Sequence, residues 1–272
     1  MLIDFHTHIF PPKIAQKTIE VLQNNAEQVS GRNARAVIGA TAYDLKTSMK
    51  NHGVDYSVVL PIATNTNQSV TINNYAEQIN KIQGIFSFGS LHPMQQNWEE
   101  TLYDIKEKGL LGIKLHPEYQ QCYIDGKETV RILKKCEELG LITVLHTGKD
   151  QGIKPPVHCS PKRLRGVIDY EVSGKLIVAG HLGGWCMWDE VLEYLTGTPL
   201  MLDTAYISSH LGKEQFERIV KNHGSEKILF ATDSPWESVS DTRKYIDTSS
   251  LSDEEKANIF YKNAKKLLKI NE

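Results

Sequence analysis

The sequence contains no long apolar run and no excess of charge of either sign. Of its 272 residues 31 are basic and 33 acidic, which gives a formal net charge of −2. No stretch approaches the roughly 20 apolar residues that a membrane-spanning helix needs. A charge so close to zero provides no general attraction to nucleic acid or to an anionic membrane. We therefore expect no nucleic-acid partner and no membrane association.

Cysteine is scarce and unpaired in the sequence. The four cysteines form no CxxC pair, and they are Cys122, Cys136, Cys159 and Cys186. This spacing is typical of reduced thiols in an intracellular protein rather than of a disulfide framework. The N-terminus carries Asp4, His6 and His8 where a signal peptide would need a basic head and an apolar core. Together these features predict a cytoplasmic protein.

Short apolar runs recur along the whole chain, with helical patterns between them. Several runs are nearly continuous in apolar character, which is typical of parallel strands covered on both faces of a sheet. The eight predicted strands cover residues 2–8, 56–64, 85–93, 110–117, 141–148, 175–184, 199–206 and 227–235.

The predicted helices between these strands have recognisable ends. Ser160 precedes Pro161, which is the arrangement of an N-cap followed by proline at the first helical position. Ser252 and Glu255 have the spacing of a capping box. The segment 126–140 has one apolar face and ends in a glycine, so we expect a helix there.

The tetrapeptide KNHG occurs twice, each time just before a predicted strand. We expect Gly53 and Gly224 to stop a helix in a left-handed conformation. On this interpretation His52 and His223 are turn residues.

Strand and helix alternate eight times without a linker-like stretch. This pattern predicts the α/β class and a single (β/α)8 TIM barrel over residues 1–272. Residues 11–50 hold more than one helical pattern before the second strand. We expect a helical insertion there, between strands one and two, that covers one mouth of the barrel.

Histidines gather where the predicted strands end. In a barrel of this kind the chemistry collects at the carboxyl ends of the strands, where chance would place about one of the ten histidines. Six lie there, namely His6, His8, His92, His116, His146 and His181. His6 and His8 are two positions apart and so project from the same face of a strand. With Asp233 at the end of the eighth strand, these imidazoles indicate a divalent metal site.

The ordered set of motifs resembles a known superfamily. HxH on strand one, histidines that end strands five and six, and an aspartate that ends strand eight look like the amidohydrolase superfamily of metal-dependent barrels. The segments GIKLHP, LHTG, GHLGG, ATDSPW and NAKKLL are similar to its amidohydrolase-2 branch, which includes decarboxylases as well as hydrolases. The similarity spans the whole chain.

The resemblance implies a ligand set for the principal metal, which is His6, His8, His146 and Asp233. Such a set suits Zn²⁺, with one or two ions bound, and Mn²⁺, Fe²⁺ or Co²⁺ as alternatives. Asp233 would also accept a proton from metal-activated water. His181 would either ligate a second metal or bind the substrate and donate a proton. Asp4 is either an acceptor that orients an imidazole or a buried structural residue.

Lys114, on strand four, has two possible roles. In binuclear superfamily members a lysine at this strand is carbamylated and bridges two metals, so Lys114 would be a further ligand. The alternative is an ammonium that binds a substrate carboxylate or pairs with Asp233. His116, two residues later, is expected to contact the substrate or to orient a ligand.

Aromatic residues follow strands six and eight at the same mouth. Trp185 and Trp236 form an apolar substrate-binding wall or, alternatively, pack against neighbouring loops. Residues 148–159 make the longest irregular stretch after strand five. This loop is either a lid that brings Lys149 or Lys154 to an anionic substrate, or a solvated loop.

Three classes of function are compatible with these residues. The first is a metal-dependent hydrolase that cleaves a small-molecule amide, lactone or ester with metal-activated water, and this is our main expectation. The alternative is a metal-dependent decarboxylase of a small carboxylic acid, and the third is a non-catalytic metal- or ligand-binding barrel. A nuclease is disfavoured because no basic cluster surrounds the predicted mouth. We expect a small-molecule substrate, and the chain could form a homo-oligomer.

Overall fold

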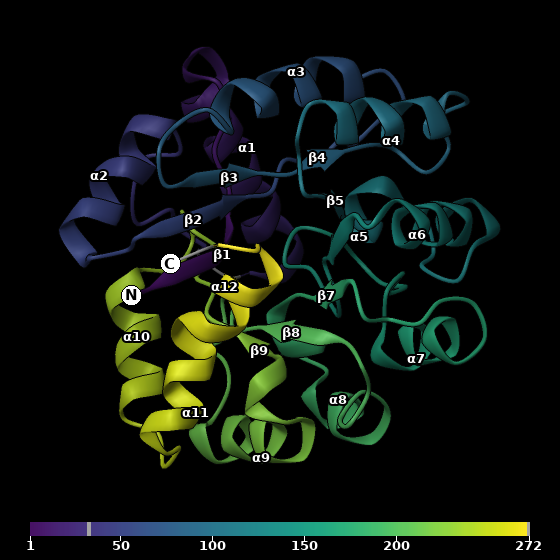
Figure 1. The fold of residues 1–272 in the computed structure, drawn as a ribbon. Coiled ribbons are helices and arrows are strands. Elements are labelled where there is room, and N and C mark those ends of the chain that lie inside the picture. Colours follow the sequence, from purple (N-terminus) through teal and green to yellow (C-terminus); the bar gives the residue numbers. More distant parts are fainter. Residues whose placement is uncertain (32–33, 271–272) are drawn as a thin grey trace.

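The computed structural model describes residues 1–31 and 34–270 as an α/β protein with parallel strands. Figure 1 shows the strands around the centre, the helices outside them, and both termini on the same side. The strands are β1 (Ile3–Thr7), β2 (Tyr56–Val59), β3 (Ile85–Ser87), β4 (Gly89–Ser90), β5 (Gly112–Leu115), β6 (Ile142–Leu145), β7 (Ile177–Ala179), β8 (Met201–Asp203) and β9 (Ile228–Leu229).

Backbone hydrogen bonds join these strands into one ring. β1 to β3 pair in order, and so do β4 to β9. β3 and β4 are two parts of one strand, interrupted at Phe88, whose N–H donates to the Val59 carbonyl at 2.9 Å. Beyond β9 the chain runs along β1, since Phe5 N–H donates to Phe230 O and Asp233 N–H to His6 O, both at 2.9 Å. The fold is therefore the predicted (β/α)8 barrel.

The helices follow the strands around the outside of the ring. They are α1 (Pro12–Ser30), α2 (Ala42–His52), α3 (Ser69–Ile79), α4 (Trp98–Glu107), α5 (Pro117–Gln120), α6 (Lys127–Leu139), α7 (Pro161–Tyr170), α8 (Trp188–Tyr194), α9 (Lys213–His223), α10 (Val239–Asp247), α11 (Asp253–Ala257) and α12 (Asn263–Leu267). None of the helices in the described part of the chain is long and apolar enough to cross a bilayer. α1 is the predicted insertion, and α2 takes the ordinary place of a helix between two barrel strands.

The predicted helix ends are largely confirmed. Ser160 caps α7 by accepting a hydrogen bond from Arg163 N–H, with Pro161 as the first helical residue. Ser252 and Glu255 form a complete capping box at the start of α11. α6 fills the expected segment and ends at a left-handed glycine.

The KNHG prediction is only partly correct. Gly53 is left-handed as expected, with φ 68° and ψ 34°. Gly224 has a positive φ of 102° but a ψ of 122°, so it leaves α9 in an extended direction. His52 and His223 are the last residues of their helices rather than turn residues. The sequence repeat therefore marks two helix ends of different geometry.

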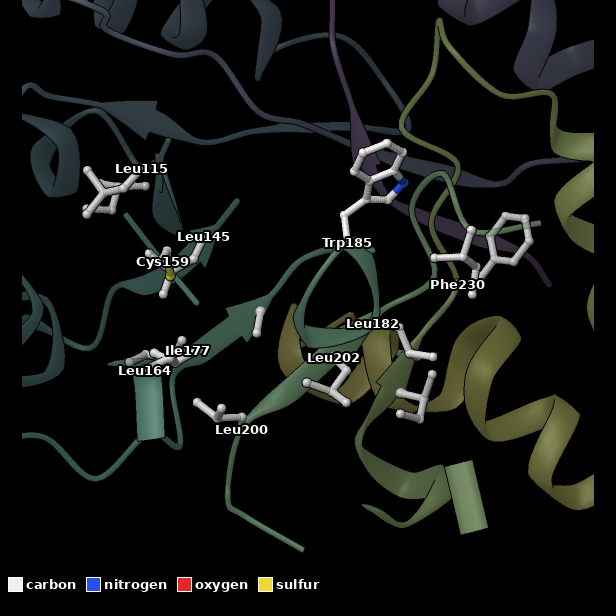
Figure 2. Packing of buried hydrophobic residues seen from close by; sticks show 14 of the residues in the cluster. Leu115, Leu145, Cys159, Leu164, Ile177, Leu182, Trp185, Leu200, Leu202 and Phe230 are labelled. Atoms are coloured by element: carbon white, nitrogen blue, oxygen red, sulfur yellow. The ribbon is translucent and has the colours of Figure 1, made fainter. Parts of the chain in front are cut away.

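Buried apolar side chains fill the barrel and the space between the strands and the helices. Figure 2 shows part of the outer layer, in which Leu145, Leu164 and Ile177 lie near one another. Inside the barrel, Phe5 packs edge-on against Phe88 with ring centroids 6.0 Å apart. These two layers fix the strand ends from which the site residues project.

β1 does not alternate regularly. Asp4 lies opposite Ser57 of β2, but Thr7 lies opposite Val59, so β1 has one more residue in this interval than its partner. Such a bulge changes which side chains share a face. The expectation that Asp4 shares the face of His6 assumed unbroken alternation, and the bulge removes that assumption.

His223 provides a test of this packing through pH. Its Nε2 hydrogen-bonds the Leu200 carbonyl at 2.9 Å, and burial lowers the pKa of the imidazole to about 4. In the unfolded chain this imidazole binds a proton with a pKa near 6.5, whereas in the folded chain it does so only near pH 4. The free energy of unfolding therefore falls as the pH drops from about 6.5 to about 4. For this one group the loss is at most about 3 kcal/mol.

We expect His223→Gln to flatten the pH dependence, because glutamine keeps a donor for Leu200 and does not titrate. Urea unfolding at several pH values between about 7 and about 4 would measure it, with the wild type as reference. Parallel stability curves for the two proteins would contradict the assignment.

Candidate metal centre

Five side chains from four strand ends converge at one mouth of the barrel. His6 and His8 come from β1 and the residue after it, and His146 follows β6. His181 begins the turn after β7, and Asp233 follows β9. All five line a cavity of about 210 Å³. The structure thus places the four residues that the resemblance implied as ligands around one cavity, and it brings possible ligand atoms of His6, His8 and Asp233 within 4.8 Å of one another.

The backbone at two of these residues is strained. Asp233 has φ 62° and His181 has φ 56°, a left-handed conformation that residues other than glycine rarely adopt. Such outliers cluster at functional sites, where the surrounding structure holds them in place. Gly148 has a related constraint, since φ is 86° and a Cβ there would lie 2.2 Å from Trp185 N. Glycine is required at this point because the loop after β6 passes directly against the loop after β7.

In each of the four histidines, the ring nitrogen that points away from the cavity, the outer nitrogen, lies within hydrogen-bond distance of an oxygen atom. His6 Nδ1 lies 2.8 Å from Asp203 Oδ2, and His8 Nδ1 lies 2.8 Å from Leu60 O. His146 Nε2 lies 3.0 Å from Lys149 O, and His181 Nδ1 lies 2.9 Å from Ala205 O. Carbonyl and carboxylate oxygens only accept hydrogen bonds, so each ring donates its outer N–H. A neutral ring with this tautomer directs a lone pair into the cavity.

The inner nitrogen atoms therefore meet one another and Asp233 as acceptors. His8 Nε2 and His6 Nε2 lie 3.1 and 3.4 Å from Asp233 Oδ1. His146 Nδ1 lies 3.0 Å from His181 Nε2. Lone pairs at these separations repel unless a proton or a metal cation lies between them. A set of imidazoles with one carboxylate is the donor set that Zn²⁺, Mn²⁺ and Fe²⁺ take in proteins, so the residues fit a divalent metal.

Burial sets the protonation of these groups. It lowers the pKa of His6 and His146 well below the usual value, with nearby positive charge adding to the effect, and it also lowers the pKa of His181. All three rings are therefore neutral, as ligation requires. Burial raises the pKa of Asp233, whereas protonation of the adjacent His8, His6 and His181 rings at low pH would lower it, and the net result is a pKa of about 2. Asp233 is ionised at neutral pH.

The side chain of Lys114, on β5, also extends to this group of imidazoles. Its side chain is fully buried, and its Nζ lies 3.0 Å from His6 Nε2. Burial lowers the pKa of the amine to about 8, while the carboxylates of Asp203 and Asp233 oppose that effect. Lys114 is thus a cation placed against the lone pair of a candidate metal ligand.

A second group of possible ligands lies across the cavity, formed by His116, His146 and Asp150. Its tautomers do not suit a metal. His116 Nδ1 accepts the Tyr119 N–H at 3.3 Å, so its proton is on Nε2, which faces Asp150. His146 Nε2 carries a proton as well, because it donates to Lys149 O. These nitrogens are donors here, and we assign no metal to this group.

The acid that orients His6 is Asp203, not Asp4. Asp203 ends β8, and its Oδ1 accepts the N–H groups of His181 and Ala205 while Oδ2 takes His6 Nδ1. Asp4 instead accepts both the N–H and the hydroxyl of Thr232, at 3.0 and 2.7 Å, and so joins β1 to the end of the barrel. Asp203 lies within the seventh predicted strand, residues 199–206, but nothing in the sequence gave it a partner.

The remaining predicted residues divide between the cavity and its surroundings. Trp185, Trp236 and Lys149 line the cavity together with His116, whereas Lys154 lines a neighbouring hollow. Three residues of the insertion α1 complete the cavity wall at helical spacing, namely Thr18, Leu22 and Ala26. The insertion therefore covers the mouth of the barrel, as predicted.

Comparison with known proteins identifies the family. The model of the amidohydrolase family matches residues 3–270, nearly the whole chain, so the chain belongs to this family. Comparison with curated proteins gives no significant match.

Solved structures with the same fold share little sequence with the chain. 5-Carboxyvanillate decarboxylase from Sphingomonas paucimobilis is 16% identical, with a TM-score of 0.70 and 99% of each chain covered. Dihydroxybenzoic acid decarboxylase from Polaromonas, solved with manganese and an inhibitor, is 15% identical with a TM-score of 0.71, covering 100% of this chain and 97% of that one. A probable 2-pyrone-4,6-dicarboxylic acid hydrolase from Acinetobacter baumannii is 17% identical with a TM-score of 0.68 and 99% of each covered. At these identities the likeness supports the fold alone.

The orientation of His6 by Asp203 can be tested by removing one charge. In Asp203→Asn the amide oxygen would stay with the two backbone N–H groups, and the amide NH₂ would face His6. That arrangement forces the proton of His6 onto Nε2 and removes its inward lone pair. We expect the affinity for Zn²⁺ or Mn²⁺ to fall by about 10- to 100-fold, as measured by competition with a chelator.

Asp4→Asn is the matched control, because it alters an equally buried aspartate near the same strand end that touches no imidazole. Its metal affinity should stay within about twofold of the wild type, whatever it does to stability. Equal affinity in the wild type and Asp203→Asn would show that Asp203 does not set the tautomer.

Proposed function

We propose that this protein is a metal-dependent lyase that removes CO₂ from a small, largely apolar carboxylic acid. The observation that carries the proposal is the content of one cavity. It combines four inward-facing imidazole lone pairs and an ionised Asp233 with a buried lysine, Lys114. Much of the rest of its wall is apolar or aromatic, including Phe10, Leu22, Ile62, Tyr119, Trp185 and Trp236.

The wall suits a flat apolar body that carries a single acidic group. Aromatic and aliphatic side chains exclude water from such a body, while a few polar groups fix its orientation. Lys114 and Lys149 are the lysines among the described residues that line the cavity, and neither Arg35 nor any other described arginine lines it. Two structures with this fold, from Sphingomonas and Polaromonas, bear the names of decarboxylases of aromatic acids, which supports the same reading.

In this proposal His6, His8, His146 and Asp233 hold one divalent metal. The metal supplies a Lewis acid that polarises a substrate oxygen. His181 keeps its Nε2 lone pair beside His146 and is available as a further ligand or as an acceptor for the substrate. Asp233 stays ionised and would supply the negative charge of this ligand set.

Decarboxylation then needs a proton for the carbon that CO₂ leaves. The C–C bond breaks, its electron pair stays on that carbon, and one proton must reach the carbon from the enzyme. Lys114 is buried in the cavity wall and, with a pKa of about 8, holds a proton on Nζ at neutral pH, so we assign it the delivery. We favour an unmodified lysine over a carbamate because Lys114 Nζ lies 3.0 Å from His6 Nε2, where an ammonium donates a hydrogen bond.

Hydrolysis of a small amide, lactone or ester is the second candidate. The observation in its favour is the position of Asp233, which is ionised and lies beside His8 and His6, where it could accept a proton from metal-activated water. The similar fold of the probable pyrone-dicarboxylic acid hydrolase supports this candidate too. Both reactions use the same ligands, so only the products separate them.

Product analysis in D₂O distinguishes the two reactions. The metal-loaded protein would be incubated with a panel of carboxyl-¹³C-labelled aromatic acids and a panel of lactones, amides and esters. Decarboxylation releases ¹³C-labelled CO₂ and leaves deuterium on the ring carbon that carried the carboxyl group. Hydrolysis releases no labelled CO₂ and places no deuterium on a ring carbon. We expect labelled CO₂ from at least one acid and none from a His6→Ala, His8→Ala double variant. Turnover confined to the lactone, amide or ester panel would replace the lyase by the hydrolase.

Lys114→Met tests the assigned proton donor. Methionine keeps the volume of the side chain but carries no proton, so we expect kcat for decarboxylation to fall by about 10²- to 10⁴-fold. Elemental analysis should still find one metal ion per chain in this variant, as in the wild type. Two metal ions in the wild type and one in the variant would instead support the bridging carbamate.

A further inference from the structure

A second hollow lies beside the metal cavity, and the two share part of their walls. The lining of the second hollow comes from the end of α1, the loop after β6 and the turn after β7. Four residues line both spaces, and they are Lys149, Asp150, Gln151 and Trp185. The two spaces therefore adjoin at these side chains.

Neither space alone has the size of a typical ligand site. The second hollow has a volume of about 290 Å³ and the metal cavity one of about 210 Å³. Binding sites for small molecules usually enclose roughly 300 to 1,000 Å³. Each space by itself falls short of this range, whereas the two together lie within it. The volumes therefore favour one ligand that occupies both spaces.

The walls of the second hollow are anchored to the rest of the fold. Glu118 is only 2% exposed, and it accepts the His158 N–H at 2.6 Å and lies 2.6 Å from the His158 ring, which fixes the far end of the loop. Gly152, in the middle of the loop, packs against α1, since a Cβ there would lie 3.4 Å from Asn25 Cβ. The hollow is therefore a fixed feature of the fold.

Gln151 offers an unused acceptor where the two spaces meet. Its Oε1 is buried and accepts no hydrogen bond from any residue in the described part of the chain. Buried polar atoms are normally paired, and leaving one without a partner costs free energy. An unpaired carbonyl oxygen that lines both spaces thus indicates a place for a donor on a ligand that crosses from one to the other.

Much of the remaining wall suits an apolar group. Five apolar side chains line the second hollow but not the metal cavity, namely Val29, Ile153, Pro155, Pro156 and Val157. Lys149 and Lys154 are exposed, so their charged ends stay in water. The carboxylate of Glu118 is already bonded to His158. An aromatic or aliphatic group would therefore find contact area here without having to supply a charge.

We propose that the second hollow binds the distal half of an extended acid, and that Gln151 accepts a hydrogen bond from an N–H group where the two halves of this substrate join. The inference rests on the proposed function, which places the carboxyl half in the metal cavity. It names the class of substrate more closely, as an aromatic acid with a second apolar group attached through an amide.

Binding of matched acids to the metal-loaded protein tests this subsite without requiring turnover. The probes are benzoate, meta- and para-benzamidobenzoate, and the corresponding phenacylbenzoates, in which CH₂ replaces the N–H group. Titration calorimetry would give each Kd. We expect one benzamidobenzoate to bind at least about tenfold more tightly than benzoate, because its second ring is buried. It should also bind at least about threefold more tightly than its phenacyl partner, which has no donor for Gln151.

Val29→Trp tests whether the second ring lies in the hollow. Val29 lines the second hollow and not the metal cavity, so a tryptophan there would fill the space that the second ring needs. We expect the advantage of the benzamidobenzoate over benzoate to fall at least about threefold. Val21→Trp is the matched control, because Val21 lies on the same helix, is 47% exposed and lines neither space. It should keep the wild-type advantage.

Gln151→Met tests the acceptor separately. Methionine keeps the length of the side chain but has no carbonyl oxygen. We expect the benzamido and phenacyl compounds to bind this variant within about twofold of each other. A preference for the benzamido compound as large as in the wild type would show that Gln151 is not its partner.

The outcomes separate this inference from the function on which it rests. If benzoate binds and no benzamidobenzoate gains over it, the second subsite is wrong and the proposed lyase stands. Slower association of benzoate in Val29→Trp, with the wild-type advantage intact, would make the hollow a passage and overturn the subsite as well. If none of the acids binds and no acid releases CO₂, the proposed function fails and the inference fails with it.

Discussion

The metal centre depends on where four imidazole protons are held. Each of His6, His8, His146 and His181 gives its outer N–H to an oxygen that can only accept, and so each has its lone pair in the cavity. Three of these oxygens are backbone carbonyls that the barrel itself positions, which ties the chemistry of the centre to the geometry of the fold. The fourth oxygen belongs to the side chain of Asp203, whose other carboxylate oxygen accepts hydrogen bonds from two backbone N–H groups. Ligands orientated in this way need little rearrangement when a metal binds.

The sequence predicted the members of this centre because their positions obey the rules of the fold. Strand ends can be read from apolar runs that stop, and in a barrel those ends meet at one mouth. His146 and His181 lie far apart in the sequence, yet both follow such a run, and their nitrogens are 3.0 Å apart. The helix that covers this mouth was also predictable as surplus helical sequence between the first two strands.

The residues that the sequence could not place depend on local geometry. Asp4 appeared to share a face with His6, but one additional residue in β1 breaks the alternation on which that expectation rested. Asp203 lies within the seventh predicted strand, but its hydrogen bond to His6 joins residues 197 positions apart. Asp150 lies in a loop without periodicity, and only the turn at Gly152 directs its carboxyl group inward. Register, partner and turn conformation are set by tertiary packing, which a single sequence does not display.

The joint between β1 and the end of β9 has a consequence for how the protein is made. Asp4 and Thr232, 228 positions apart, hold this joint, and the ligands His6, His8 and Asp233 lie directly beside it. A ribosome releases the two histidines long before the aspartate. The candidate metal centre is therefore incomplete until Asp233 has been synthesised and the end of β9 has joined β1. Closure of the barrel would in this sense precede the binding of a metal.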